Sequence, residues 1–146
     1  MDSGLKYPTF NVKIKHEGKK ALVFDEVRKK WIVLTPEEWV RQNFLQYLVQ
    51  ELKYPESLIA VEKEFRFGEM NRRFDILVYN KSHQPWLMVE CKAPEIILDQ
   101  SVLEQVLRYN ISIPVEYLVI TNGSNGFAWQ KGRELLPINV MPVYPA

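Results

Sequence analysis

Charged side chains interrupt two otherwise apolar segments, and they constrain the fold more than any other feature of the sequence. Asp75 lies inside the apolar run at residues 74–78, while Glu90 and Lys92 close the apolar run that begins at Trp86. On a β-strand, Glu90 and Lys92 point to the same face because they are two residues apart. If these two strands are hairpin neighbours, Asp75 lies beside Glu90. Burying a lone charge is costly, so the three groups need partners.

Asp75, Glu90 and Lys92 together leave one excess negative charge. Adjacent carboxylates repel each other unless one of them takes up a proton. A divalent cation would also remove the excess, and Mg²⁺ takes one or two protein carboxylates together with water and a substrate phosphate. Such an ion would activate water, while Lys92 orients that water or neutralises a phosphate oxygen. The spacing alone leaves open a second interpretation, a buried salt-bridge cluster without a ligand.

The composition restricts which metal sites this chain can form. It contains one cysteine, Cys91, and two histidines, His16 and His83. This excludes an internal disulfide framework and leaves almost no room for a His/Cys metal site. Any metal must therefore bind mainly carboxylate oxygens, which favours Mg²⁺, Mn²⁺ or Ca²⁺. We expect Cys91 to be a buried, inert thiol, because its side chain points away from the face that carries Glu90 and Lys92.

The charge distribution restricts the choice of partners. The 146 residues carry a net charge of +1, so binding to nucleic acid needs a local patch. Residues 1–30 supply one, with eight Lys or Arg against four Asp or Glu. Within it, residues 28–30 are interpreted as a solvated turn, with phosphate contact as the alternative. The four tryptophans are expected in the core or at its boundary. No apolar run approaches the roughly 18 residues of a membrane span. The first residues lack a secretion signal, and we expect a cytoplasmic protein without a membrane partner.

Hydrophobic periodicity predicts an α/β fold with a mixed sheet flanked by helices. Thr35, Pro36 and Glu38 have the pattern of a helix N-cap, first helical position and capping box. Strands are expected near residues 10–15, 21–24 and 31–34, then a helix over 36–53, strands over 57–67, 72–79 and 86–91, a helix over 99–110, and strands over 115–120 and 127–130. We expect an N-terminal β extension (1–34) packed on a core (35–137), followed by a tail (138–146), in one domain.

The order of these elements and the charged residues resemble the PD-(D/E)-x-K nuclease superfamily. More narrowly, five motifs resemble the N-terminal nuclease-domain family of type I restriction enzyme R subunits. They are Thr35-Pro36-Glu37-Glu38-Trp39-Val40-Arg41-Gln42, Arg73-Phe74-Asp75, Val89-Glu90-Cys91-Lys92-Ala93-Pro94, Gln105-Val106-Leu107-Arg108-Tyr109-Asn110 and Thr121-Asn122-Gly123. The resemblance covers about residues 20–137. It implies a restriction-endonuclease-like fold with the core order αβββαβ and extra N-terminal strands.

The resemblance also implies roles for residues on the second and third core strands. Asp75 and Glu90 would be metal ligands, for Mg²⁺ or Mn²⁺, and the backbone carbonyl of Cys91 would supply a third oxygen. Lys92 would be the catalytic lysine. Phe74 stands where the family motif has proline, a position that many members also vary.

The two predicted helices contribute further candidates. A glutamate of the first helix commonly completes the family's site, and we favour Glu38, with Glu37 as a close competitor and the capping box as the other role for Glu38. Gln105 and Tyr109 match a Gln-x-x-x-Tyr motif, and their i, i+4 spacing places them on one helix face. Gln105 would hydrogen-bond the site or a phosphate. Tyr109 would pack against Lys92 or contact the nucleic-acid backbone. The alternative is a surface Gln and a half-buried Tyr.

The function that the resemblance implies is Mg²⁺-dependent hydrolysis of DNA phosphodiester bonds. The sequence contains no Gly-rich phosphate-binding loop followed by Lys-Ser/Thr, so we expect no helicase motor and a separate motor or specificity subunit as a partner. Two alternatives remain at this point. One is a non-catalytic nucleic-acid-binding or assembly module that retains the nuclease fold. The other is a nuclease similar to Holliday-junction resolvases, which would need a homodimer.

Overall fold

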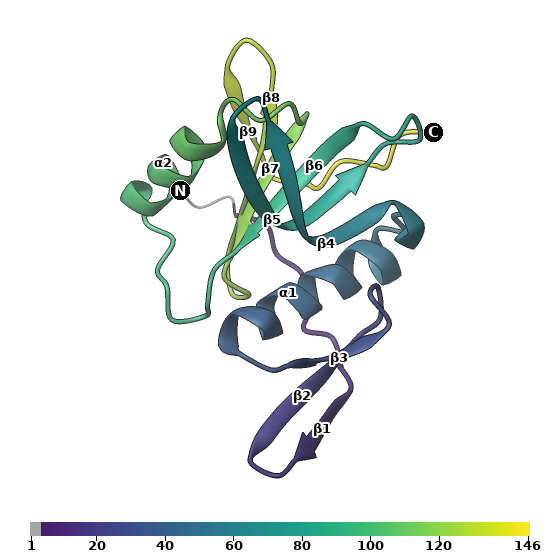
Figure 1. Cartoon of the computed structure of the whole chain (residues 1–146). Helices are drawn as coiled ribbons and strands as arrows, with labels where there is room; N and C mark the ends of the chain where they lie inside the picture. The colour runs from purple at the N-terminus through teal and green to yellow at the C-terminus, as the bar shows by residue number, and fades with distance from the viewer. Residues whose placement is uncertain (1–3) are drawn as a thin grey trace.

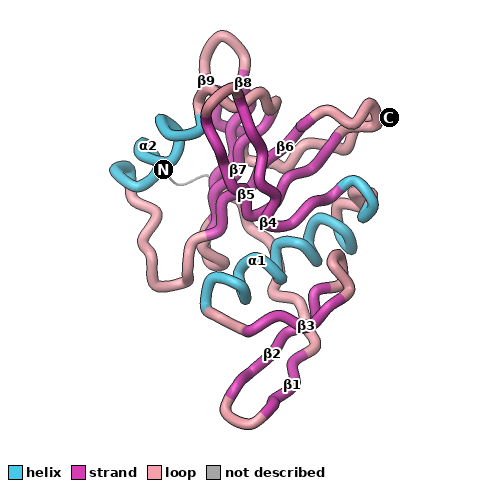
Figure 2. Tube along the Cα trace, viewed as in Figure 1, coloured by secondary structure: helices cyan, strands magenta, loops and turns pink. Residues whose placement is uncertain are grey.

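A computed structural model describes residues 4–146, apart from the side chains at positions 65, 67 and 70. These residues form a small antiparallel sheet, a larger mixed sheet and two α-helices (Figures 1 and 2). The small sheet has the order β1-β2-β3, with β1 at Ile14–Glu17, β2 at Lys20–Asp25 and β3 at Lys30–Val33. The helices are α1, Pro36–Gln46, and α2, Gln100–Asn110. Two short helical turns, η1 (Tyr47–Glu51) and η2 (Glu56–Leu58), follow α1.

The larger sheet has the order β4-β5-β6-β7-β8-β9. Its strands are β4 Ile59–Phe67, β5 Met70–Tyr79, β6 Pro85–Cys91, β7 Tyr117–Thr121, β8 Gly126–Lys131 and β9 Leu135–Ile138. The pairing of β6 with β7 is parallel and the other pairings are antiparallel. A parallel pair needs a crossover connection, which α2 supplies. The predicted fold class is therefore confirmed, including the order αβββαβ and the extra N-terminal strands.

The large sheet is buried on both faces, which explains its long apolar strands. Alternation along β5 sends Ile76 and Val78 into a cluster with Phe44 of α1. Leu77, between them, packs with Leu103 of α2 in a second cluster. The two helices therefore cover opposite faces of the sheet, and the middle of β5, which carries Asp75, lies between them.

Helix α1 begins where the sequence predicts. The backbone N–H of Glu38 donates to Oγ1 of Thr35 at 3.0 Å, and Pro36 occupies the first turn. The helix continues as the π-helical turn η1 to Glu51, so the helical segment ends two residues before the predicted limit. Lys53 then adopts a positive φ of 60° ahead of Tyr54 and Pro55, which redirects the chain toward β4.

The N-terminal segment differs from its prediction. The alternation from Phe10 predicts a strand there, but β1 begins only at Ile14. The backbone N–H of Phe10 instead donates to Oδ1 of Asn43 on α1 at 2.8 Å, so this segment follows the helix rather than pairing with β2. Strand β1 also extends beyond the predicted limit at residue 15, because His16 and Glu17 pair with residues of β2.

Three of the four tryptophans are packed as predicted. Trp86 and Trp129 are buried, and Trp39 is partly buried against the first cluster. Trp31 on β3 is the exception, since 38% of it is exposed. No helix among the described residues is long and apolar enough to cross a bilayer.

We expect Phe44→Ala to lower the free energy of unfolding by about 3–5 kcal/mol, because it empties a fully buried position between α1 and the sheet. Urea denaturation followed by circular dichroism measures the change. Leu136→Ala is the control, since Leu136 is 55% exposed and its truncation should cost about 0.5 kcal/mol or less. Equal losses in the two variants would contradict this description of the core.

Candidate functional site

Asp75 and Glu90 lie next to each other on two neighbouring strands, Asp75 in the middle of β5 and Glu90 near the end of β6. The last pair in the β5–β6 register is Ile76 with Val89, and one step further along places Asp75 opposite Glu90. Oδ2 of Asp75 accepts a hydrogen bond from the backbone N–H of Cys91 at 2.7 Å. This bond ties the Asp75 carboxylate to the strand that carries Glu90.

Lys92, which directly follows the last residue of β6, pairs with Glu90 of that strand. The Nζ of Lys92 lies 2.9 Å from Oε2 of Glu90, and both side chains are partly exposed. The backbone N–H of Lys92 donates to the carbonyl of Thr121 at 2.8 Å, which fixes this end of β6 against β7. Burial acts to lower the pKa of Lys92, but the hydrogen bond with Glu90 and the charges of Glu90, Asp75 and Glu37 outweigh it and raise that pKa.

Gln105 and Tyr109 of α2 face the same region. Together with Glu90, Lys92, Val102 and Val106, they line a pocket of about 250 Å³. Tyr109 is 58% exposed, and the guanidinium carbon of Arg72 lies 3.6 Å from its ring centroid. The structure therefore brings four of the predicted site residues around one pocket, at the place where β6 meets α2.

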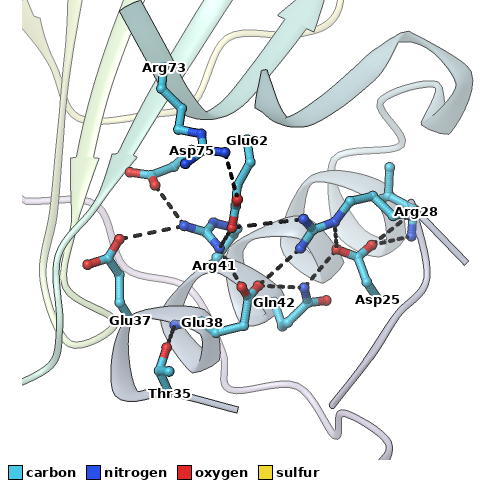
Figure 3. Close-up of polar contacts among 11 residues, drawn as sticks. Asp25, Arg28, Thr35, Glu37, Glu38, Arg41, Gln42, Glu62, Arg73 and Asp75 are labelled. Carbon is cyan, nitrogen blue, oxygen red and sulfur yellow. Dashed lines mark hydrogen bonds and ion pairs between the residues drawn. The ribbon is translucent and has the colours of Figure 1, made fainter. Parts of the chain in front are cut away.

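The buried guanidinium of Arg41 connects Asp75 to α1 and β4. Its Nη2 lies 2.8 Å from Oδ1 of Asp75 and 3.5 Å from Oε1 of Glu37 (Figure 3). Its Nη1 lies 2.5 Å from Oε1 of Glu38 and 2.8 Å from Oε1 of Glu62. Burial acts to lower the pKa of Arg41, but the hydrogen bond with Asp75 and the neighbouring carboxylates raise it, so the side chain stays charged.

The two glutamates at the start of α1 occupy different surroundings. Glu38 is buried, and its carboxylate also accepts from Nε2 of Gln42 at 2.9 Å and pairs with Arg28 at 3.5 Å. Glu37 is half-exposed, and its pKa is raised by partial burial first and then by repulsion from Asp75. Lys92 and Glu90 also act on Glu37. Glu37 thus faces the Asp75–Glu90–Lys92 group, and Glu38 faces the interior. The role that the resemblance implies for Glu38 stays a prediction.

An interior network that the sequence did not indicate supports this site. Asp25 is fully buried and accepts from Nε of Arg28 at 2.6 Å and from Nε2 of Gln42 at 3.0 Å. The predicted turn is present, with Lys29 and Lys30 exposed, but the interpretation of Arg28 as solvated is wrong, because its side chain is only 17% exposed. The signal that was available is the Asp25-x-x-Arg28 spacing, since Asp favours the first position of a turn.

Glu62 has an unusual backbone conformation. It lies on β4 between the paired residues Val61 and Lys63, in the position opposite Asp75, and its φ is 53°. Non-glycine residues rarely adopt positive φ, and such strain persists only where surrounding contacts impose it. Its carboxylate contacts Arg41 at 2.8 Å, Arg73 at 3.8 Å and Arg28 at 3.9 Å. The ion pairs therefore hold this residue, and no local sequence signal predicts it.

The charges of this region do not cancel. Among the described residues, six carboxylates meet four cations here, an excess of two negative charges: Asp25, Glu37, Glu38, Glu62, Asp75 and Glu90 against Arg28, Arg41, Arg73 and Lys92. Within residues 4–146, no three or more His, Cys, Asp or Glu side chains converge as a metal site would require. The donors nearest the pocket are hard carboxylate oxygens, which suit Mg²⁺ or Mn²⁺. Both oxygens of Asp75, however, already accept hydrogen bonds.

Cys91 is buried in this region. Burial first, and then the charge of Asp75, raise the pKa of its thiol well above the usual value. The side chain is 2% exposed and belongs to the cluster on the α1 face of the sheet. The prediction that Cys91 is a buried thiol is confirmed. His16 and His83 are exposed, so neither contributes to the site.

Comparison with known families places these residues in context. Residues 36–144 match the family model described as the type I restriction enzyme R protein N terminus. The chain belongs to this family. The match includes the predicted site residues of α1, β5, β6 and α2 and confirms the resemblance that the motifs indicated.

The structure is also similar to a solved one, a candidate nuclease of the family DUF820 from Anabaena variabilis. The two chains share 13% sequence identity, and the alignment covers 86% of this chain and 80% of the other, with a TM-score of 0.49. No curated protein gives a significant match to the sequence.

We expect Asp25→Asn to destabilise the fold by on the order of 3 kcal/mol near neutral pH, because it leaves Arg28 without its buried counter-charge. Burial acts to raise the pKa of Asp25, but hydrogen bonds from the Arg28 backbone, Gln42 and the Arg28 guanidinium outweigh it and lower that pKa below its usual range. A lowered folded pKa gives stability that is present above the unfolded pKa and is lost as pH falls through the folded value.

The stability difference between wild type and Asp25→Asn should therefore be largest at about pH 7 and shrink below about pH 3.8. Urea denaturation at several pH values measures it. The exposed Glu134→Gln is the control and should change stability little throughout. A difference between wild type and Asp25→Asn that grows on acidification would contradict the charge pairing described here.

Proposed function

We propose that this chain is a Mg²⁺-dependent nuclease that hydrolyses phosphodiester bonds in DNA. The observation that carries the proposal is the meeting of Asp75, Glu90 and Lys92 where the pairing of β5 with β6 stops, beside a pocket that Glu90 and Lys92 line. Two carboxylates and an ammonium beside such a pocket suit phosphate chemistry, which needs a cation, a positioned water and neutralisation of developing charge. Membership of the type I restriction enzyme R protein N-terminal family supports a nuclease domain and favours DNA as the substrate.

Asp75 and Glu90 are the side chains that would hold the metal ion, with the Cys91 carbonyl as a further oxygen. Their donor type fits Mg²⁺, and the excess of negative charge around them favours binding of a cation. When bound, the ion would supply Lewis-acid activation of water and stabilisation of charge on the phosphate. Arg41 is the internal competitor for this position, because it already neutralises one oxygen of Asp75.

The remaining residues act from around the pocket. The ammonium of Lys92 is oriented by Glu90 and lines the pocket, so it can donate to a phosphate oxygen or to the attacking water. The amide of Gln105, on the opposite wall, can hydrogen-bond the same phosphate. Glu37 faces Asp75 and Lys92 from α1 and adds a half-exposed carboxylate that can accept a proton from water.

One observation favours a second function, that of a non-catalytic nucleic-acid-binding or assembly module. Both oxygens of Asp75 accept hydrogen bonds within the protein, and Glu90 is paired with Lys92. A cluster that satisfies itself in this way needs no ligand for stability. The two functions differ in metal binding and in turnover, so separate measurements of metal binding and of DNA cleavage distinguish them.

We expect the wild-type chain to bind Mn²⁺ in isothermal titration calorimetry, and Asp75→Asn/Glu90→Gln to lose that binding, because the double variant removes both charged ligands while keeping shape. Glu134→Gln is the matched control, since it removes one exposed carboxylate on the turn between β8 and β9. Circular dichroism establishes that each variant is folded. Wild-type binding that persists unchanged in the double variant would contradict the assignment of the ligands.

The catalytic half of the proposal needs its own measurement. With Mg²⁺ and a panel of duplex and single-stranded DNA, we expect cleavage that EDTA abolishes and that Lys92→Ala slows by about 10²–10³-fold, the range for loss of one charge-stabilising donor. Metal binding without cleavage of any DNA in the panel would favour the binding-module function. Cleavage by Lys92→Ala at the wild-type rate would contradict the role of Lys92.

A further inference from the structure

The small sheet β1–β3 lies beside α1, and its β1–β2 hairpin extends beyond the helix (Figure 1). Val23 and Asp25 of β2 are fully buried, and Asp25 is bonded to Gln42 of α1, so this side of β2 packs against the helix. The side chains that alternate with them, Leu22 and Phe24, therefore lie on the other side, where Phe24 borders a pocket that Gln46 of α1 and Val49 of η1 also line. We call this second side the outer face.

The outer face combines aromatic, apolar and lysine side chains in two rows across the strands. One row contains Phe24 and Trp31, which are register partners, and Lys13, whose carbonyl accepts from the N–H of Phe24 at 2.9 Å. The next row contains Lys15, Leu22 and Val33, which are also register partners. Trp31 is 38% exposed and Val33 50% exposed, so this face is accessible to a partner.

The lysines of the outer face lie over its aromatic rings. The Nζ of Lys15 is 4.4 Å from the centroid of the Trp31 ring, and the Nζ of Lys13 is 5.6 Å from that of Phe24. The rings of Phe24 and Trp31 also contact each other, with centroids 5.2 Å apart. Each lysine has a surface ion pair, with Glu26 at 3.5 Å and Glu17 at 3.3 Å. Exposed ion pairs of this kind contribute little to stability, so both ammonium groups can leave these glutamates and pair with another anion.

Positive charge is concentrated on this sheet. Residues 13–33 contain seven Lys or Arg and three Asp or Glu, although the whole chain has a net charge of only +1. Asp25 and Arg28 neutralise each other in the interior, which leaves six lysines against Glu17 and Glu26. The charge of the outer face and its edges is therefore complementary to a polyanion, and it lies apart from the acidic cluster.

We propose that the outer face of β1–β3 binds single-stranded nucleic acid, with bases stacked on Trp31 and phosphates paired with Lys13 and Lys15. Surfaces that bind single strands combine a positive track for the backbone with aromatic side chains on which successive bases stack. A duplex keeps its bases stacked inside, so it would use the lysines but not the Trp31 ring. The choice of nucleic acid as the partner rests on the proposed function, while the binding itself requires neither metal nor cleavage.

The small sheet is anchored to the acidic cluster through polar contacts. The side-chain amide of Gln42 donates hydrogen bonds to Asp25 of β2 and to Glu38 of α1 (Figure 3). Arg28 forms ion pairs with Asp25, Glu38 and Glu62. A strand held on the outer face would therefore be held by an element that is fixed relative to β5 and β6. This gives the nuclease a means of retaining a single strand that does not depend on its metal ligands.

The test is fluorescence anisotropy of a fluorescein-labelled oligothymidine with the full chain, at low salt and in EDTA. We expect wild-type binding, and a loss of about 10-fold in Trp31→Ala, within the range for removal of one stacked base. Trp31→Phe keeps an aromatic ring and should bind close to the wild-type level. Lys13→Ala/Lys15→Ala should weaken binding and reduce the slope of log K against log salt by about 1.4, from two lost phosphate contacts. Lys81→Ala, an exposed lysine in the turn before β6, is the control and should bind like wild type.

Three results would overturn this proposal: no binding by the wild type, equal binding by Trp31→Ala and the wild type, or tighter binding of a matched duplex with the same dependence on Trp31. Circular dichroism and urea denaturation exclude unfolding as the cause of a loss. Asp75→Asn/Glu90→Gln separates the two proposals. It should bind the oligonucleotide like wild type in EDTA, whether or not the site proves to be a metal site. Loss of binding in that double variant, with binding by Trp31→Ala unaffected, would place the single strand at the acidic cluster. It would overturn the proposal that the outer face is the binding surface.

Discussion

The ion pairs of the Arg41 guanidinium are the interaction on which the architecture of the site depends. This one buried cation contacts three carboxylates that lie far apart in the sequence: Glu38 of α1, Glu62 of β4 and Asp75 of β5. In a low-dielectric interior these carboxylates would repel one another strongly without it. Arg41 therefore determines how close α1 lies to the middle of β5, and it sets the orientation of Asp75 toward Glu90. The strained backbone at Glu62 is a consequence of the same contact.

The sequence predicts the arrangement of Asp75, Glu90 and Lys92 well because each step depends on local rules. Alternation along β5 and β6 determines the faces of the side chains, and an antiparallel pair of strands with buried side chains leaves little freedom of register. The start of α1 follows from Thr35 and Pro36, whose hydrogen bond and fixed φ act within a single turn. These features survive in the structure because tertiary contacts agree with them.

The rest of the site could not be predicted, because it depends on contacts between distant residues. Arg41, Gln42 and Arg28 look like ordinary polar residues of a helix and a turn, and only the folded chain brings them to Asp25 and Glu62. The positive φ of Glu62 has no local signal. The strand expected from Phe10 begins only at Ile14 for a similar reason: the backbone N–H of Phe10 donates to the side chain of Asn43, 33 residues later.

The near-neutral net charge conceals two regions of opposite sign. The acidic cluster between α1, the middle of β5 and the end of β6 suits a cation, and the lysine-rich outer face of β1–β3 suits a polyanion. Their contributions cancel in the sum, which is why the overall charge argues only weakly against nucleic-acid binding. The link between them through Arg28 and Gln42 keeps both regions on one rigid unit.

The most direct measurement is a crystal structure of the wild-type chain grown with Mn²⁺ and recorded at the manganese absorption edge. We predict an anomalous peak at coordination distance, about 2.0–2.2 Å, from carboxylate oxygens of both Asp75 and Glu90. We also predict that Arg41 has released Oδ1 of Asp75 while keeping Glu38 and Glu62. A crystal that contains Mn²⁺ elsewhere, with Arg41 still paired with Asp75 and no peak at this position, would contradict the proposal that Asp75 and Glu90 bind the metal.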